Sequence, residues 1–560
     1  MKIKSFGVEK FKGLLWAGSL NLLIDYISHL TDTAVAGNLL GGDALAGVNL
    51  SLPCFSLAIF FGSLVAVGMA NHYSLLMGRC DQRGAHRIFA QGLWNILILS
   101  GVFALAVFLF RDQILAYYGA SGEILKYAAD YLGLVWPSMF FVGLFLLLVM
   151  LGYADGDSKL CMGAYLTVLL VNVVLSVVSV KLGYGTSGIG GATTLAYIAG
   201  IGVMSLHFFK KCNSLRPVKH FSFKDAFAIC RESFGDSSEF LCDAVFIMFI
   251  NRFAFVHFGA EALIIAGVAM TVLGSNKLFD GIGVALQPIL TVYFGERNFK
   301  SMRRVMASAM RISLIGGILL TIVIIAFAPI IVSFLGVIDP QLASRAVVAL
   351  RFVGLSFVAY AFIGLFNSYY MFIERTMLSA ILSIVTCLIL PVITMATFSI
   401  GGETAFFAGM GLGPTLGLLA CALTLRFFVG RDRFPLLLDH TRDEKLHVFD
   451  LNLEDHEIVE VSSQVGKLPG VPMKAALITE EVLMAVKDRA HGRRLLGEVT
   501  VDLNDGVLLT IRDDGEIFDI TDTDAEITSL RSFLVASVME THRDRHNLMT
   551  TGFNRNVLRF

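Results

Sequence analysis

The most constraining feature of this sequence is a long unit that occurs twice in tandem. The stretch GGDALAGV near Gly41 is matched by GAEALIIAGV near Gly259. The charged turn Gly78–Asp81 is matched, at an offset of 217 residues, by Gly295–Asn298. The segments between these landmarks are almost wholly apolar. A duplicated membrane-spanning unit is typical of transporters whose two halves rock about a central site, so the repeat predicts that kind of fold.

Composition supports a membrane protein and argues against several other classes. Hydrophobic residues make up 56% of the chain and charged residues 16%, against roughly 25% charged residues in soluble domains. The 53 glycines are typical of helices that approach closely in lipid. No basic tract indicates a nucleic-acid partner. The eight cysteines are scattered without metal-like spacing, so we expect neither a disulfide framework nor a metal site.

Apolar windows of about 20 residues indicate twelve transmembrane helices. We expect spans near 14–37, 45–70, 88–110, 131–152, 161–182, 188–209, 234–256, 262–292, 310–336, 346–372, 378–400 and 405–428. The predicted fold class is therefore an all-α polytopic membrane protein with two six-helix lobes. The expected boundaries are an N-terminus at 1–13, an N-lobe at 14–215 and a C-lobe at 216–430.

The charged loops predict the orientation of these spans. Lys and Arg gather at the N-terminus, in three loops and after the last span; the loops are 79–87, 210–231 and 297–304. The intervening loops carry mostly acids. By the positive-inside rule, both termini are cytoplasmic. We expect a multi-pass protein of a bacterial inner membrane, with the lipid bilayer as its partner.

A change of character after Phe428 predicts a second domain. Residues 431–445 form a polar linker, and residues 446–560 read as a small cytoplasmic α/β domain. Period-2 apolar stretches predict strands. The expected strands are His447–Leu453, Glu498–Leu503, Val507–Arg512 and Asn556–Phe560, and the expected helices are Lys474–Arg489 and Ile527–Thr541.

Ionisable residues within spans are the candidates for function, because burying a charge in lipid is costly. In the first span Asp25, His29 and Asp32 occur at i, i+4 and i+7, on one helical face. They could exchange protons, or chelate a small cation with Ser28 and Thr31. The alternative is that Asp32 is a solvated cap at the membrane surface and that His29 is a packing residue.

The first span of the second half repeats this pattern of acids. Its acids, at i, i+3 and i+7, are Asp236, Glu239 and Asp243. Asp243 overlies Asp25 at the repeat offset, which favours a functional role. Lys277 and Asp280 follow at i and i+3 in the next span. They could pair with each other or with the preceding acids, and a structural ion pair is as good an interpretation as a substrate contact.

Two stretches carry a family resemblance. LTDTAVAGNLLGGDALAGV resembles the opening of multidrug and toxic compound extrusion (MATE) transporters, and FINRFAFVHFGAEALIIAGV resembles the start of their second half. The resemblance covers about residues 12–430. It implies two lobes forming a V around a central cavity, and cation export coupled to inward H⁺ or Na⁺ movement. It also implies coupling roles for Asp32 and Asn172, but Ser176 stands where the family often has a further aspartate.

The sequence thus predicts a secondary active exporter of a small organic, cationic or amphipathic compound, driven by H⁺ or Na⁺ and without a cofactor. A lipid-linked saccharide flippase of the same superfamily is an alternative, but it needs a cationic cavity. The deep cations here are chiefly Lys277, Arg252 and Arg351. A further alternative is a membrane sensor that signals through its C-terminal domain.

The C-terminal domain resembles the GHKL ATPase fold of anti-sigma-factor kinases. The run IRDDGEIFD resembles the adenine-reading D-x-G loop, with Asp513 and Gly515 in place. Met484 occupies the position of the Mg²⁺-binding asparagine, and a thioether cannot hold this hard cation. We therefore expect a degenerate nucleotide pocket without ATPase activity, and a regulatory protein as the partner of this domain.

Overall fold

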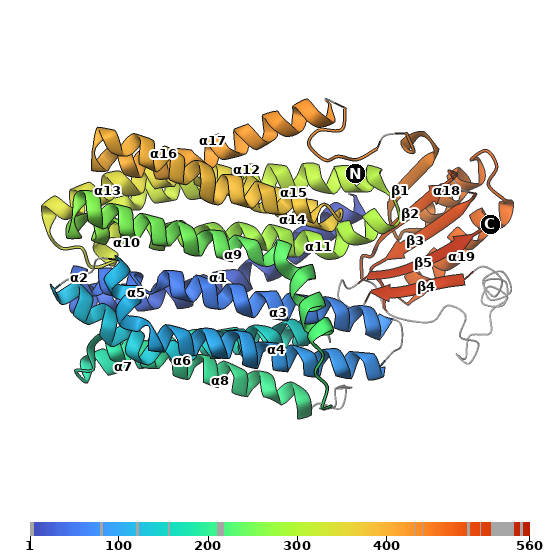
Figure 1. Cartoon of the computed structure of the whole chain (residues 1–560). Helices are drawn as coiled ribbons and strands as arrows, with labels where there is room; N and C mark the ends of the chain where they lie inside the picture. Colours follow the sequence, from blue (N-terminus) through green and yellow to red (C-terminus); the bar gives the residue numbers. More distant parts are fainter. Residues whose placement is uncertain are drawn as a thin grey trace. The chain divides into compact units, whose positions relative to one another are not determined.

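The structure is a computed structural model of the 560-residue chain (Figure 1). It describes residues 5–78, 82–118, 122–154, 157–209, 218–430, 432–439, 441–489, 493–504, 506–516, 543–548 and 553–560. The chain divides into two compact units. We call Gly18–Gly283 with Arg311–Leu425 the helical unit. We call Met1–Ala17 with Val284–Met310 and Arg426–Phe560 the tail unit.

The first half of the chain folds into long helices that pack through small residues. These are α1 (Phe6–Leu40), α2 (Gly42–Asn49), α3 (Leu52–Gly78), α4 (Gln82–Leu109), α5 (Arg111–Tyr118), α6 (Gly122–Ala154), α7 (Ser158–Lys181) and α8 (Gly185–Ser205), followed by a 3₁₀ turn at Leu206–Phe209. Helix α8 packs against both α6 and α7. A side chain at Gly190 would collide with the backbone of α6 near Tyr131, so glycine permits this close approach.

The second half of the chain repeats the helical pattern but is more irregular. Its elements are α9 (Phe223–Phe258), α10 (Ala260–Leu273), a 3₁₀ helix (Gly274–Phe279), α11 (Asp280–Gly295), α12 (Phe299–Phe334), α13 (Pro340–Gly354), α14 (Phe357–Phe372), α15 (Thr376–Ser383), a π-helix (Ile384–Ile389), α16 (Leu390–Phe398), a 3₁₀ turn (Ser399–Gly401) and α17 (Glu403–Val429). Short 3₁₀ and π segments inside long helices often mark functional sites.

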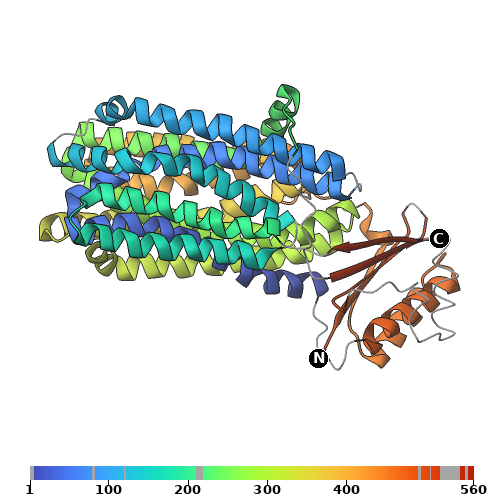
Figure 2. The same cartoon turned by 90° about the horizontal axis from the view of Figure 1, so that it is seen from below.

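Within the helical unit, helices of the two halves contact each other. Helix α3 packs along α9, where Ser237 Oγ donates to Ser63 Oγ at 3.3 Å. Helix α2 packs on α10, where Thr271 Oγ1 lies 3.5 Å from Asn49 Oδ1. Figures 1 and 2 show the long helices of both halves running in roughly the same direction. The two halves therefore form one helical body with polar contacts between them.

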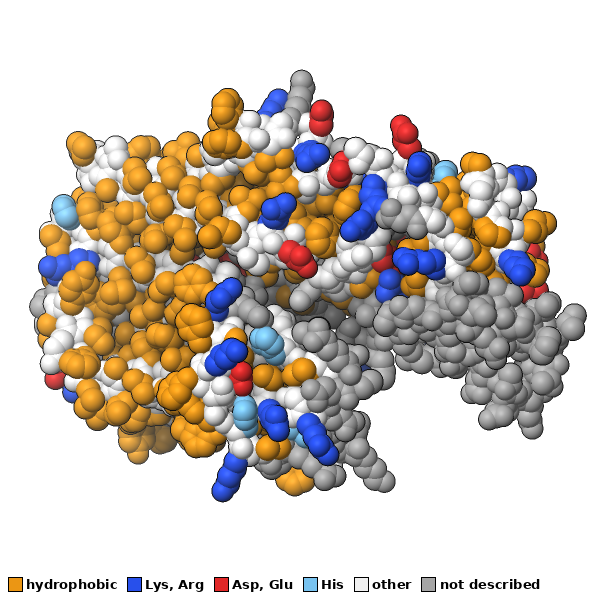
Figure 3. Space-filling view, turned by 45° about the vertical axis from the view of Figure 1, so that its right-hand side comes forward, with side chains coloured by type: hydrophobic (Ala, Val, Ile, Leu, Met, Phe, Trp, Pro, Cys, Tyr) orange, Lys and Arg blue, Asp and Glu red, His pale blue; other side chains and the backbone are white. Residues whose placement is uncertain are grey.

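Most of the expected spans coincide with helices. Among the described residues, 10 helices are long and apolar enough to cross a membrane, or 11 if the bent pair α13–α14 is one span. This pair, Pro340–Gly354 and Phe357–Phe372, meets at an angle of 42°. Helix α1, which covers the expected first span, is not among the 10 or 11. A total of twelve spans stays a prediction. Figure 3 shows that hydrophobic side chains dominate one face of these helices, as lipid contact requires.

The C-terminal part of the tail unit is an antiparallel sheet with helices on one face (Figure 2). The strand order is β1-β2-β3-β5-β4. The strands are β1 (Leu446–Asn452), β2 (Leu496–Asp502), β3 (Leu508–Asp513), β4 (Arg543–Leu548) and β5 (Phe553–Arg559), and the helices are α18 (Asp455–Gly466) and α19 (Met473–Asp488) after a 3₁₀ turn at Asp443–Lys445. Val499, Ile511 and Leu558 pack with both helices in a buried core.

The expected strands of this domain lie where β1, β2, β3 and β5 are, and the expected helix Lys474–Arg489 lies at α19. Helix α18 was not predicted from the sequence, because acids separate its apolar residues Ile458, Val461 and Val465. Strand β4 was not predicted either. The expected helix Ile527–Thr541 lies outside the described residues.

Candidate functional site

A buried carboxylate, Asp32 of α1, gathers donors from three other helices. Its side chain is only 6% exposed. Asp32 Oδ2 accepts hydrogen bonds from Tyr131 Oη of α6 and Thr193 Oγ1 of α8, both at 2.7 Å. Asp32 Oδ1 accepts from Asn172 Nδ2 of α7 at 3.1 Å. Phenol, hydroxyl and amide are neutral donors, so these three bonds position the carboxylate without neutralising its charge.

Asn172 is itself fixed in orientation by its neighbours. Its Nδ2 lies 3.3 Å from the backbone oxygen of Ser28, and its Oδ1 accepts from Ser176 Oγ at 3.0 Å. Ser176 and Asn172 are both buried. We call Asp32, Tyr131, Asn172, Ser176 and Thr193 the Asp32 cluster. Its groups are oxygen-rich, which suits a proton or a hard cation such as Na⁺.

Part of this cluster was predicted from the sequence, namely Asp32 and Asn172, which the structure places in direct contact. Tyr131 and Thr193 were not predicted. The hydroxyl of Thr193 does not stand out in the sequence, because hydroxyls in spans commonly bond their own helix. The side chains of Asp25 and His29 lie outside the described residues, although the backbone of both belongs to α1. Their roles stay predictions.

A second cluster surrounds Lys277, which lies in the 3₁₀ helix between α10 and α11. Lys277 Nζ is 3.1 Å from Glu239 Oε1 and 3.2 Å from Asp243 Oδ2, both on α9. It also lies 4.6 Å from the ring centroid of Phe240. Glu239 Oε2 accepts from Asn367 Nδ2 of α14 at 3.3 Å. We call Lys277, Glu239, Asp243 and Asn367 the Lys277 cluster.

The Lys277 cluster is more open than the Asp32 cluster. The side chains of Lys277, Glu239 and Asp243 are 26%, 22% and 29% exposed. The three side chains therefore form a partly exposed surface, although the helices that carry them are apolar. Two carboxylates share one ammonium group, which leaves a net charge of about −1 if all three groups are ionised. Such a surface attracts cations.

The structure gives less information on the other two predicted acids of this region, Asp280 and Asp236. Asp280 begins α11, one turn after Lys277, and its Oδ1 would lie 3.3 Å from a Cβ at Gly364 of α14. The ion pairs of Lys277 are with Glu239 and Asp243 of α9. The side chain of Asp236 lies outside the described residues. Asn367 was not predicted as a site residue from the sequence, although it is a lone amide in a span, as Asn172 is.

In the tail unit, the two residues of the predicted nucleotide loop are engaged within their own domain. Asp513 is buried, and its Oδ1 accepts from the backbone nitrogen of Gly515 at 3.0 Å and from Asn554 Nδ2 at 2.8 Å. A Cβ at Gly515 would lie 2.7 Å from Val486 Cγ1 of α19. Met484 packs against the domain core. The loop therefore packs tightly between β5 and α19.

Comparison with known proteins identifies the family. The sequence model of the MatE family matches residues 19–178 and 239–413, more than half of the chain. The multidrug export protein MepA of Staphylococcus haemolyticus (strain JCSC1435) is 25% identical over 338 residues, which are 59% of this chain and 73% of that protein. MepA of Staphylococcus aureus (strain N315) is 25% identical over 193 residues, which are 34% of this chain and 43% of that protein.

Solved structures agree on the fold. An inward-facing conformation of a multidrug resistance MATE family transporter of the MOP superfamily has a TM-score of 0.66 at 20% identity, covering 72% of this chain and 94% of that one. An outward-facing conformation of such a transporter has a TM-score of 0.61 at 21% identity, covering 76% of this chain and 97% of that one. The chain therefore belongs to the MatE family of integral membrane transporters, the multidrug and toxic compound extrusion family.

Proposed function

We propose that this transporter is a secondary active exporter of organic cations or amphipathic compounds, driven by inward movement of H⁺ or Na⁺. The observation that carries the proposal is the buried Asp32 carboxylate, which neutral donors from three helices hold in place. The similarity to MepA, a protein described as a multidrug exporter, supports the same substrate class. The proposed location is a bacterial inner membrane, with both termini in the cytoplasm.

The chemistry of Asp32 supports coupling. A buried carboxylate is costly when charged, so uptake of one proton or one Na⁺ stabilises it. The donors Tyr131, Asn172 and Thr193 come from α6, α7 and α8, so ion uptake changes the electrostatics where four helices meet. If the ion-bound and ion-free forms favour different orientations of the two halves, the ion gradient drives the cycle.

The Lys277 cluster supports a cationic substrate. Glu239 and Asp243 are two partly exposed carboxylates, and Lys277 offsets only part of their charge. A cationic substrate would interact with the same carboxylates as the Lys277 ammonium group. This arrangement disfavours the flippase alternative, because the ammonium group that a pyrophosphate would need is already paired with two acids.

The proposal is tested by transport into inside-out membrane vesicles. A labelled organic cation should accumulate in the vesicles when H⁺ or Na⁺ is more concentrated in the vesicle lumen than outside, and accumulation should collapse when that gradient is dissipated. Imposing the two gradients separately identifies the coupling ion. Gradient-independent accumulation, or accumulation driven only by ATP, would exclude secondary active export of that compound.

We expect Thr193→Val to impair coupling without impairing folding. Its hydroxyl donates to Asp32 Oδ2, and a hydrogen bond to a charged group contributes about 1.5–3 kcal/mol. Gradient-driven export should fall about tenfold, since each 1.4 kcal/mol corresponds to roughly a factor of ten. Thr194→Val is the matched control, because the Thr194 hydroxyl bonds the backbone oxygens of Leu134 and Gly190 instead. Equal effects of the two substitutions would contradict the role of Thr193.

We propose that the C-terminal domain lacks ATPase activity. Asn554 and Val486 fill the space beside Asp513 and Gly515, and Met484 offers no oxygen ligand for Mg²⁺. The purified full-length protein should release no phosphate from ATP above the background of a protein-free sample. Mg²⁺-dependent hydrolysis that Asp513→Ala abolishes would overturn this expectation.

A further inference from the structure

One face of the C-terminal sheet is polar and yet buried. Side chains alternate along a strand, so Val499 of β2 and Ile511 of β3 face the helices α18 and α19. Their neighbours Glu498 and Arg512 point to the opposite face, and both are 0% exposed. The two residues pair across the sheet. A polar sheet face is normally solvated, so another part of the tail unit must cover this one.

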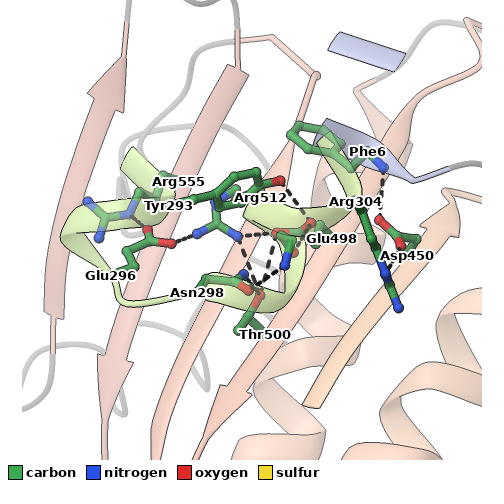
Figure 4. Close-up of polar contacts among 11 residues, drawn as sticks. Phe6, Tyr293, Glu296, Asn298, Arg304, Asp450, Glu498, Thr500, Arg512 and Arg555 are labelled. Carbon is green, nitrogen blue, oxygen red and sulfur yellow. Dashed lines mark hydrogen bonds and ion pairs between the residues drawn. The ribbon is translucent and has the colours of Figure 1, made fainter. Parts of the chain in front are cut away.

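The covering segment is the turn between α11 and α12 together with the adjoining ends of both helices. We call residues 293–301 the α11–α12 turn. Tyr293 Oη donates to Glu498 Oε2 at 2.9 Å, and Ser301 Oγ lies 3.3 Å from the same oxygen. Asn298 Nδ2 lies 3.4 Å from Thr500 Oγ1 on β2. Figure 4 shows the side chains of Tyr293 and Asn298 pointing toward those of Glu498 and Thr500 on the sheet. All of them belong to the tail unit.

Ion pairs join the turn to the sheet at the centre of this contact. Arg512 forms an ion pair with Glu498 of its own sheet and a second one with Glu296 of the turn. Glu296 also pairs with Arg555 of β5. The Arg512 guanidinium carbon lies 4.8 Å from the ring centroid of Tyr293. The Glu296 side chain is only 7% exposed, so these pairs are screened little by solvent.

The beginning of α1 is held by the same sheet. The backbone nitrogen of Phe6 donates to Asp450 Oδ1 at 2.8 Å, and Lys10 Nζ lies 2.8 Å from Asp514 Oδ2. Arg304 of α12 bonds the other oxygen of Asp450 at 3.0 Å. Asp450 of β1 therefore links a helix from the first half of the chain to a helix from the second half (Figure 4). Helix α1 continues unbroken along the chain to Asp32.

Burial makes this contact depend on every partner. Burial raises the pKa of Glu498 to about 8, and the nearby Asp450 carboxylate adds to the rise. Burial also lowers the pKa of Arg512 to about 10. Burial thus makes both charges costly, and leaving one of the buried groups without its partner is strongly unfavourable. The contact should release cooperatively rather than loosen gradually.

We propose that the C-terminal domain is a clamp that restrains the transport cycle. Its sheet holds the start of α1, from the first half of the chain, together with the α11–α12 turn, from the second half. Alternating access requires the two halves to separate at one end and then at the other. A clamp that keeps these two helix ends together disfavours the state in which they separate, so releasing it speeds turnover. A partner that binds the domain can then regulate transport by strengthening or weakening the contacts of the sheet with these two helix ends.

The test uses Glu296→Gln in the full-length protein, because Glu296 lies outside the sheet and its removal leaves the core of the domain intact. We expect faster hydrogen–deuterium exchange across residues 290–304, unchanged protection of β2 and β3, and an initial export rate about threefold to tenfold higher. Tyr293→Phe removes one hydroxyl and no charge, and should give a smaller change in the same direction. This second variant keeps the test decisive if Glu296→Gln fails to fold.

Lys487→Gln is the matched control. Lys487 pairs with Asp455 and so joins α19 to α18 on the other side of the sheet. Its loss should change neither the hydrogen–deuterium exchange across residues 290–304 nor the export rate. Unchanged exchange in the turn of Glu296→Gln would show that the clamp is absent. Faster exchange with an unchanged or lower export rate would show that the contact supports transport rather than restraining it. The exchange measurement does not depend on transport, so failure of the clamp is distinguishable from failure of the proposed export function.

Discussion

Asp32→Asn is expected to abolish gradient-driven export while leaving folding and membrane insertion largely intact. The substitution keeps the size of the side chain and its place beside Tyr131 and Thr193. It removes the charge that we propose takes up H⁺ or Na⁺, and an amide is cheaper to bury than a carboxylate. Export of a labelled organic cation by vesicles with an imposed gradient should therefore fall to the background of vesicles without the protein.

Asp43→Asn is the matched control for this experiment. Asp43 is an exposed acid in the first turn of α2, close to Asp32 in sequence, so its loss removes a charge outside the Asp32 cluster. Export by Asp43→Asn should equal that of the unaltered protein. Full export by Asp32→Asn at normal expression would show that the coupling acid lies elsewhere. Loss in Asp25→Asn alone would move the coupling site along α1.

Lys277→Met is expected to destabilise the protein and to reduce export strongly. It leaves Glu239 and Asp243 facing each other without their shared ammonium group. Breaking a fully buried ion pair costs about 3–5 kcal/mol, and we expect about 2 kcal/mol here because these side chains are partly exposed. The change is measured as the midpoint of thermal unfolding of the purified protein in detergent. Adding Glu239→Gln should restore part of the lost thermal stability, because it removes one of the unpaired charges.

Lys181→Met serves as the control for Lys277→Met. Lys181 is an exposed residue in the last turn of α7, so its loss should leave thermal stability and export unchanged. A Lys277→Met protein as stable as the control would show that the ion pairs contribute little. If Glu239→Gln makes the Lys277→Met protein still less stable, Glu239 is held by Asn367 rather than by charge.

The helical fold was largely predictable from the sequence, because each span needs an apolar run of fixed length. The bend between α13 and α14 was not predictable, since Arg351 is the one charged residue in the expected span 346–372 and no proline marks the position of the bend. Asp32 and Asn172 could be named as candidate site residues, because a charged or amide side chain is conspicuous in an apolar span. Thr193 could not be singled out in the same way, because serine and threonine hydroxyls in spans commonly bond the nearby backbone of their own segment. The Ser187 hydroxyl, for example, donates to the backbone oxygen of Tyr184.

The contact of the C-terminal sheet with the α11–α12 turn could not be predicted. Glu498 and Arg512 alternate with apolar residues, and this pattern normally indicates side chains that face water. Their partners Glu296 and Tyr293 lie about 200 residues earlier in the chain, and no local pattern joins the two segments. Glu296 was visible only as part of the repeated charged turn, which indicated topology rather than a contact.

The most direct test of the central claim is the movement of the coupling ion itself. Purified protein in sealed proteoliposomes should move H⁺ or Na⁺ in the direction opposite to a labelled organic cation, when only a gradient of that cation is imposed. The ion flux should stop in Asp32→Asn and persist in Asp43→Asn. Movement of the organic cation without any opposing flux of H⁺ or Na⁺, or an undiminished ion flux in Asp32→Asn, would contradict coupling through Asp32.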